Sequence, residues 1–276
     1  MSAPVIFTYN LKGGVAKTTT VVNLASVLGR MGKRVLVVDL DPQSAATWML
    51  AVGPQQMGDS TYAAIMGAKP MTDIIRRSRF ENVDVAPSSE DLYGLDTDIE
   101  AVPHNREMLL TTSLAPVRNT YDLILIDSHN KYGLTEVNAL RAADRLIIPV
   151  SCGFLPFWGL TQLHHLVSRA ETKFNHPIEV LGYVVTMYHR KILNLASESK
   201  EIEQQLRGCY GGLVFGTVIE YDENIDKAAW HQEPVGYYQE HTKGTREFDQ
   251  LAEEVLGRLH HDGHVSRTTE GVTANV

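Results

Sequence analysis

Short apolar runs alternate with amphipathic helical patterns along most of this chain of 276 residues. Runs rich in Val, Ile and Leu, each with the length of a buried strand, cover residues 5–10, 34–39, 83–87, 121–127, 145–150, 179–186 and 213–219. Between them, apolar residues recur at helical spacing, which predicts helices over residues 17–31, 43–51, 59–66, 70–78, 89–101, 105–115, 133–142, 158–173, 194–207, 223–230 and 245–260. The alternation predicts an α/β fold with a mostly parallel, twisted sheet of about seven or eight strands and helices on both faces.

No internal repeat and no low-complexity linker interrupts this pattern, so the sequence predicts a single domain over residues 1–262. Residues 263–276 have neither a helical nor a strand period, and we expect them to form a disordered tail. With 43% hydrophobic and 21% charged residues, the composition is ordinary for a globular protein. The chain is long enough to bury a sizeable core.

Features of membrane-bound and secreted proteins are missing from the sequence. No apolar run reaches the roughly 20 residues that span a bilayer, and the N-terminus has no basic region followed by a hydrophobic core. The predicted helix 245–260 has an apolar stripe, but acidic residues such as Asp249 and Glu253 flank it and would be repelled by anionic lipid. Cys152 and Cys209 form no C-x-x-C motif, which is typical of inert thiols in a reducing compartment. We therefore expect a cytoplasmic protein with no membrane partner.

The most informative segment follows the first predicted strand and reads NLKGGVAKTTT, residues 10–20. Gly13 and Gly14 allow backbone N–H groups to curl around an anion, because no Cβ is in the way. The helix that begins near Lys17 directs its free N–H groups and its positive dipole end to the same place. Lys17 can reach the β- and γ-phosphates, and the Thr18 hydroxyl can ligate Mg²⁺. The segment predicts a bound nucleoside triphosphate.

This loop departs from the usual P-loop pattern G-x-x-x-x-G-K-[ST], since Leu11 and Ala16 occupy its two glycine positions. It reads K-G-G-x-[GA]-K-T instead, with an additional lysine, Lys12. In this the chain resembles the ParA family, the ParA/Soj/MinD group of deviant Walker A P-loop ATPases of the plasmid and chromosome partition type. The resemblance implies ATP and Mg²⁺ as cofactors and a homodimer in which Lys12 contacts the partner's nucleotide. The nucleotide contacts that it implies are Lys12, Gly13, Gly14, Val15, Ala16, Lys17, Thr18, Thr19 and Met187.

Two further predicted strands end in aspartates. The run 34–39 leads into D-L-D-P-Q, which contains Asp39 and Asp41, and the run 121–127 ends at Asp127 in a Walker B pattern. Carboxylates at the carboxyl ends of parallel strands lie beside the phosphate loop. The resemblance implies that Asp41 orients the attacking water, so that Lys12, Lys17 and Asp41 are the catalytic residues. It also implies a Mg²⁺ site formed by Thr18, Asp39 and Asp127.

The resemblance covers about residues 4–260, but the segment after Asp127 departs from it. The family usually has a Pro-Pro pair there, whereas this chain has Ser128-His129-Asn130. His129 can either face the nucleotide or lie in the loop as an ordinary histidine, and we favour the loop. Because the family senses the γ-phosphate with this segment, the substitution bears directly on function.

DNA binding is the point at which family and charge disagree. Members of the family typically bind DNA without sequence preference through Lys and Arg of the C-terminal third. Residues 188–262 contain 8 Lys and Arg against 14 Asp and Glu, and the whole chain carries a net charge of −8. Binding to phosphates requires clustered positive charge, which a net acidic segment can still provide locally. The candidate DNA contacts are Arg190, Lys191, Lys227, Lys243 and Arg246.

Two classes of function follow. The first is a ParA-type ATPase that dimerises with ATP, binds DNA non-specifically at the nucleoid and partitions a plasmid or chromosome. We expect weak hydrolysis, stimulated by a ParB-like or other activating partner protein. A related alternative is an ATPase that positions a protein assembly. The second class is a metabolic enzyme on the same scaffold, such as an ATP-dependent amidase or synthetase. No residue cluster in the sequence predicts the second pocket that such an enzyme needs for a small substrate.

Overall fold

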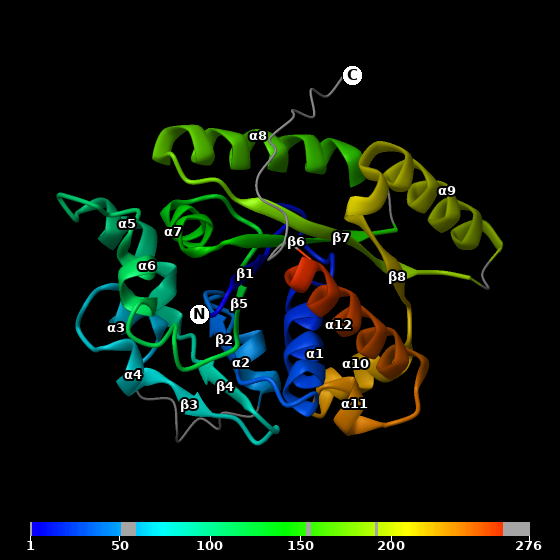
Figure 1. The fold of residues 1–276 in the computed structure, drawn as a ribbon, viewed down its shortest axis with the longest axis horizontal. Coiled ribbons are helices and arrows are strands. Elements are labelled where there is room, and N and C mark those ends of the chain that lie inside the picture. Colours follow the sequence, from blue (N-terminus) through cyan, green and yellow to red (C-terminus); the bar gives the residue numbers. More distant parts are fainter. Residues whose placement is uncertain (1, 51–58, 153–155, 191–192, 262–276) are drawn as a thin grey trace.

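The structure, a computed structural model, describes residues 2–50, 59–152, 156–190 and 193–261, so the expected tail 263–276 lies outside the described residues. The described residues form an eight-stranded sheet in the order β3-β4-β2-β5-β1-β6-β7-β8 (Figure 1). The strands are β1 (Val5–Thr8), β2 (Val35–Asp39), β3 (Arg76–Arg77), β4 (Val83–Ala86), β5 (Leu123–Asp127), β6 (Arg145–Ser151), β7 (Glu179–Tyr188) and β8 (Val214–Glu220). The predicted α/β fold and all seven predicted strands are confirmed.

The eighth strand was not predicted. β3 pairs antiparallel with β4, and the other neighbouring strands of the described sheet run parallel. The prediction of a helix over 70–78 is therefore wrong at its C-terminal end, because the helix stops at Ile74 and the backbone of Ile75 is extended. Two arginines suit this position, since charged side chains protect an exposed sheet edge from further pairing.

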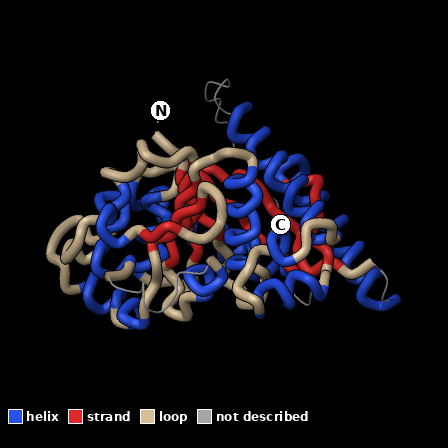
Figure 2. Tube along the Cα trace, turned by 90° about the horizontal axis from the view of Figure 1, so that it is seen from below, coloured by secondary structure: helices blue, strands red, loops and turns tan. Residues whose placement is uncertain are grey.

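Helices cover both faces of the sheet, as predicted (Figures 1 and 2). They are α1 (Lys17–Arg30), α2 (Ala45–Met49), α3 (Thr61–Ile65), α4 (Met71–Ile74), α5 (Leu95–Glu100), α6 (Leu109–Leu114), α7 (Leu134–Ala142), α8 (Pro156–Phe174), α9 (Leu193–Tyr210), α10 (Glu223–Trp230), α11 (Val235–Tyr238) and α12 (Lys243–His261). The predicted helix 89–101 is divided at Gly94 into a 3₁₀ turn and α5. The short helix α11 was not predicted.

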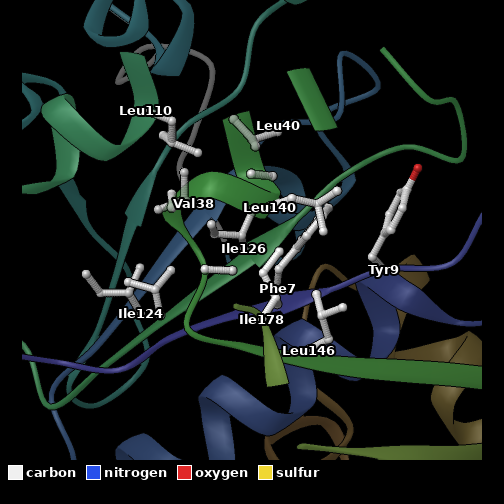
Figure 3. Close-up of a cluster of buried hydrophobic side chains, with 14 of the residues drawn as sticks. Phe7, Tyr9, Val38, Leu40, Leu110, Ile124, Ile126, Leu140, Leu146 and Ile178 are labelled. Atoms are coloured by element: carbon white, nitrogen blue, oxygen red, sulfur yellow. The ribbon is translucent and has the colours of Figure 1, made fainter. Parts of the chain in front are cut away.

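Alternate strand residues point to opposite faces and build two hydrophobic clusters. On one face, Phe7, Val38, Ile124 and Ile126 pack against helices such as α6 and α7, as the close-up in Figure 3 shows with Leu110 and Leu140. On the other face, β-strand residues such as Ile6, Val37 and Leu125 pack against α1 and α12. Burial on both faces explains why the central strands read as continuous apolar runs.

Helix α1 crosses the sheet at a position where only glycine fits. A Cβ on Gly29 would lie 2.2 Å from the carbonyl oxygen of Glu81 and 2.9 Å from a methyl group of Val83. The carbonyl oxygen of Gly29 accepts a hydrogen bond from Asn82 Nδ2 at 3.0 Å. The backbone near the C-terminal end of α1 is thus in direct contact with the turn before β4.

We expect Gly29→Ala to lower the free energy of unfolding by about 2 kcal/mol, because the backbone at Glu81 has to move to admit the methyl group. Gly257→Ala is the matched control: it also lies in a helix, but a Cβ there would meet nothing within 4 Å. This control should gain about 0.5–1 kcal/mol from the higher helix propensity of alanine. Urea unfolding of both variants measures the difference, and equal effects at the two positions would contradict the proposed close packing.

Candidate functional site

The loop between β1 and α1 has the backbone conformation of an anion-binding turn. Gly14 has φ +70°, and Ala16, which precedes the first residue of α1, has φ +63°. No side chain caps the N-terminus of α1, so its first N–H groups are left for another acceptor. The loop is fixed by Asn10, whose Nδ2 donates to the carbonyl oxygen of Pro149 at 2.8 Å and whose Oδ1 accepts from the backbone of Lys12 at 3.0 Å.

A cavity of about 270 Å³ opens at this loop. It brings together three segments that are far apart in the sequence and that follow β1, β2 and β5. Its lining residues are Gly13, Gly14, Val15, Ala16, Lys17, Thr18, Thr19, Asp41, Ser128, His129 and Asn130. The predicted loop residues are therefore placed at one cavity together with Asp41. Lys12 is not among the lining residues, but its carbonyl oxygen accepts from Lys17 Nζ at 3.4 Å.

The predicted Walker B aspartate lies next to the predicted magnesium threonine. Thr18 Oγ1 donates to Asp127 Oδ2 at 2.7 Å, while Asp127 Oδ1 is buried and has no hydrogen-bond partner among the described residues. Burial, with the neighbouring Asp39 as a second cause, raises the pKa of Asp127 well above its usual value. A buried carboxylate oxygen without a partner, beside a hydroxyl and an anion-binding turn, fits a hard cation such as Mg²⁺.

Asp39 has a different environment from Asp127, although the two are paired in register on β2 and β5. Its Oδ2 accepts from the backbone N–H and the hydroxyl of Thr47 at 2.8 and 2.7 Å, and its Oδ1 accepts from the backbone N–H of Asp41 at 3.0 Å. Burial raises the pKa of Asp39 to about 6. Both oxygens are thus engaged in holding the segment that carries Asp41, while the predicted role of Asp39 at the metal stays a prediction.

Two charged side chains of opposite sign line the cavity. Lys17 is only 8% exposed, and burial lowers the pKa of its ammonium group, an effect that Asp127 and Asp41 partly oppose. Asp41 is half-buried, and its Oδ1 accepts from the backbone N–H of Gln43 at 2.9 Å. A buried lysine at the uncapped start of a helix favours a polyanion, and the carboxylate of Asp41 supplies a proton acceptor at the same cavity.

His129, interpreted from the sequence as an ordinary loop histidine, is one of the residues that line the cavity, and whether it contacts a nucleotide stays a prediction. Its Nδ1 lies 3.0 Å from Glu136 Oε1 and 3.2 Å from the backbone nitrogen of Lys131. One ring nitrogen cannot donate and accept at once, so we assign the shorter contact, to the fully buried carboxylate, as the hydrogen bond. This hydrogen bond raises the pKa of His129, and burial raises the pKa of Glu136. The sequence offered no signal for the pair beyond the histidine itself.

A second cavity, of about 230 Å³, adjoins the loop on the side of β8. It shares three loop residues with the first cavity and adds apolar and acidic side chains from the ends of β7, β8 and α10. Its lining residues are Gly14, Ala16, Thr19, Met187, Ile219, Glu220, Tyr221, Asp222, Ile225 and Asp226. Met187, which the family resemblance places at the nucleotide, is found here with φ +53° and 38% exposure.

The candidate DNA contacts do not form a free basic patch. Arg190 and Lys243 both pair with the carboxylate of Glu220, the latter at 2.6 Å. Lys227 pairs with Glu223 at 3.2 Å. Arg246 Nη1 donates to the carbonyl oxygen of His241 at 3.2 Å, and Lys191 lies outside the described residues. The structure therefore brings two of the predicted cations together, but it does so on a carboxylate.

A cavity larger than these two lies elsewhere. It has about 960 Å³ and is bounded by the start of α7, the end of α8 and the segment before α6. Arg106, Arg169 and Lys173 stand on its lining, which contains none of the predicted site residues. Size alone does not identify the functional site here, because the titratable and anion-binding groups gather at the smaller cavities. No helix among the described residues is long and apolar enough to cross a membrane.

A phosphate-binding turn, its lysine and a strand-end aspartate together define a P-loop protein. The comparisons narrow this class: a family model described as an AAA domain matches residues 3–180. The chromosome partitioning protein ParA of Caulobacter vibrioides is 33% identical over 251 residues, which cover 90% of this chain and 92% of that protein. The sporulation initiation inhibitor protein Soj of Bacillus subtilis is 35% identical over 247 residues, 89% and 95% of the two chains. The chain belongs to the ParA/Soj family of P-loop ATPases.

A solved structure with bound nucleotide has the same fold. A crystal structure of cobyrinic acid a,c-diamide synthase from Mycobacterium smegmatis, with bound ATP analog and magnesium, has a TM-score of 0.80 and 26% sequence identity. The alignment covers 97% of this chain and 100% of that one. The relatives ParA and Soj confirm the predicted family, and this structure agrees with the predicted fold.

Proposed function

We propose that this protein is a ParA-type ATPase that partitions DNA, a plasmid or a chromosome, by cycles of ATP binding and hydrolysis. In this proposal the protein binds ATP with Mg²⁺, forms a homodimer around two nucleotides, and hydrolyses ATP slowly until a ParB-like or other partner stimulates it. The observation that carries the proposal is the convergence of Lys17, Asp41 and the Thr18–Asp127 pair on one cavity at the start of α1. Membership of the ParA/Soj family supports it.

The residues of the cavity divide the work of hydrolysis. The N–H groups of the loop and the charge of Lys17 hold the phosphates, which favours a polyanion over water in this partly closed site. Asp41 accepts a hydrogen bond from the attacking water and aligns it with the γ-phosphate. Asp39 accepts a hydrogen bond from the backbone N–H of Asp41, and the Ser88 hydroxyl donates to the carbonyl oxygen of Asp41. Thr18 and Asp127 would hold Mg²⁺, which would neutralise phosphate charge.

The second cavity suits the base of the nucleotide. It begins at the same loop residues, Gly14, Ala16 and Thr19, and continues to Met187 and Ile225. Apolar walls accept the faces of a purine, while backbone groups and carboxylates at the rim can bond its edge. A nucleotide that spans both cavities would therefore place its phosphates at Lys17 and its base beside β8.

Exposed aromatic residues support a dimer that closes over the nucleotide. Trp48, Tyr93, Tyr132 and Tyr221 are 41%, 62%, 43% and 44% exposed. They lie on the segments that follow β2, β4, β5 and β8, so all four belong to the edge of the sheet that carries the site. Aromatic side chains are enriched in protein interfaces, where they bury large areas at low entropic cost. This edge is the surface through which we propose that two subunits meet.

A metabolic activity is the second candidate, because the Mycobacterium smegmatis structure is named as a diamide synthase and shares 26% identity with this chain. The partition proteins ParA and Soj are more similar, at 33% and 35% identity. A related candidate is the positioning of a protein assembly. ATP turnover in the presence of DNA, of candidate partner proteins or of small carboxylate metabolites separates these functions.

We expect Asp41→Ala to bind ATP normally but to hydrolyse it at least about a hundredfold more slowly, because about 3 kcal/mol of transition-state stabilisation is lost with the positioned water. Single-turnover hydrolysis and nucleotide titration measure the two quantities separately. Asp73→Ala, on the exposed surface of α4, is the matched control and should behave as wild type. A wild-type rate in Asp41→Ala would show that another residue positions the water.

Substitution of Lys17 and substitution of Lys12 should have different effects. Lys17 lines the cavity of its own subunit, so Lys17→Ala should lose affinity for ATP already in the monomer. We assign Lys12 to the partner's nucleotide. The Lys12→Ala variant should therefore bind ATP but should neither dimerise nor hydrolyse ATP. Light scattering with ATP and Mg²⁺ measures dimerisation, with Lys33→Ala as the control. A stable ATP-bound dimer of Lys12→Ala would contradict its role across the interface.

We expect DNA binding to be weak, dependent on ATP and lost at moderate salt, since Glu220 and Glu223 engage three of the candidate cations. A dimer doubles a modest patch, which makes the binding depend on ATP. Arg190→Glu with Lys191→Glu should weaken it by about tenfold at low salt. Arg77→Glu with Lys33→Glu makes the same change of charge on the opposite side of the sheet and should matter less. Filter binding with ATP and with ADP measures this DNA binding. If no DNA is bound at low salt, the protein would instead be an ATPase that is positioned on another protein.

A further inference from the structure

Helices α7 and α8 lie side by side on one face of the sheet (Figure 1), and the cavity of about 960 Å³ opens between the start of α7 and the end of α8. We call this cavity the α7–α8 groove. It shares no lining residue with the two cavities at the phosphate loop, so the proposed nucleotide site makes no use of it. Leu134 and Phe174 line the groove and are only partly buried, although both pack against the core. The groove therefore presents apolar surface that a partner can cover.

Three exposed cations stand on the lining of the groove. Arg169 and Lys173 lie four residues apart on α8 and thus on the same face of the helix, and Arg106 comes from the segment before α6. Like charges at this spacing repel each other and destabilise a helix. Lys173 lies in the last turn of α8, where it complements the helix dipole, but Arg169 lies before that turn, where this effect has faded. An anion bound in the groove would offset the repulsion between the two cations.

Carboxylate partners for these cations are missing from the described part of the chain. Lys and Arg side chains elsewhere on the surface form ion pairs with Asp or Glu. No described residue forms an ion pair with Arg169 or Lys173, and Arg106 Nη1 donates to the backbone carbonyl oxygen of Glu100 at 3.3 Å. The whole chain has 33 Asp and Glu against 25 Lys and Arg, whereas the lining of the groove has three cations and one carboxylate, Glu107. The groove is thus a local reversal of the charge of the protein.

We propose that the α7–α8 groove binds an acidic, partly apolar segment of a partner protein. Carboxylates of the segment would pair with Arg106, Arg169 and Lys173, and its apolar side chains would cover Leu134 and Phe174. An arginine guanidinium binds a carboxylate through two parallel hydrogen bonds, which gives such pairs geometric specificity. Apolar contacts surrounded by charged groups are typical of protein interfaces. This inference goes beyond the proposed function and requires no nucleotide.

The composition of the lining favours a peptide over a nucleic acid. Binding to a nucleic acid backbone depends mainly on cations that neutralise successive phosphates. The groove has only three cations, and Glu107 on the same lining would repel a phosphate. Leu134 and Phe174 gain nothing from a phosphate backbone, but they can bury apolar side chains of a peptide. Charge and apolar surface therefore point to the same kind of occupant.

The test is fluorescence anisotropy of the full chain at low salt, with a labelled peptide that repeats Glu-Leu-Asp-Glu three times. A labelled peptide that repeats Gln-Leu-Asn-Gln is the neutral probe. The wild-type protein should bind the acidic peptide at least about tenfold more tightly than the neutral one, and Arg169→Glu with Lys173→Glu should abolish this preference. Leu134→Ala should weaken the binding of both peptides by about threefold, because apolar contact is lost.

A matched control separates the groove from the net charge of the protein. Arg77→Glu with Lys200→Glu makes the same change of charge at two exposed positions outside the groove and should retain the preference for the acidic peptide. Equal losses in the two double variants would overturn the proposal, as would equal affinities of the wild-type protein for the two peptides. Binding of a labelled DNA duplex but of neither peptide would assign the groove to phosphates and would also overturn it. If circular dichroism shows that the groove double variant is unfolded, Arg169→Gln decides, and an unchanged preference in this variant contradicts the proposal.

Discussion

Two carboxylates buried side by side in the centre of the sheet impose the constraint around which the site is built. Asp39 and Asp127 end neighbouring strands, are paired in register and are both 0% exposed. Their mutual repulsion and lost hydration have to be compensated by nearby donors. Thr47 and the backbone of Asp41 compensate Asp39, which fixes the chain after β2. Thr18 compensates only one oxygen of Asp127, so the other is left for a cation. The network around the two carboxylates therefore contains one buried oxygen without a partner among the described residues.

Those parts of the site that depend on local pattern could be predicted from the sequence. The loop around Gly13 and Lys17 follows an apolar strand and precedes a helix, and Asp41 and Asp127 follow apolar runs. A parallel sheet brings such strand ends to one edge, so their proximity follows from topology alone. Seven strands of the sheet were predicted from their apolar runs, whereas β3 was not, because its two arginines carry no strand pattern.

The remaining contacts depend on side-chain directions that no pattern specifies. Glu136 lies within the first turn of α7, where a carboxylate ordinarily faces solvent, yet here it is buried against His129. The pairing of Arg190 and Lys243 joins the end of β7 to the start of α12 through Glu220, across more than fifty residues of sequence. Net charge alone could not say which cation pairs with which carboxylate, so the ion pairs of Glu220 could not be predicted. Such pairs depend on tertiary packing between distant segments, which a local sequence pattern does not reveal.

Glu220 belongs to two environments at once. Its carboxylate lines the cavity that continues from the phosphate loop, and the same carboxylate holds Arg190 and Lys243 at the surface. A ligand that changes the position of Glu220 therefore changes the freedom of both cations, and a polyanion that draws the cations away changes the cavity. Coupling of this kind is reciprocal, so the two ligands would alter each other's affinity by the same factor. Through this one carboxylate, binding in the cavity would be coupled to binding at the surface that carries Arg190 and Lys243.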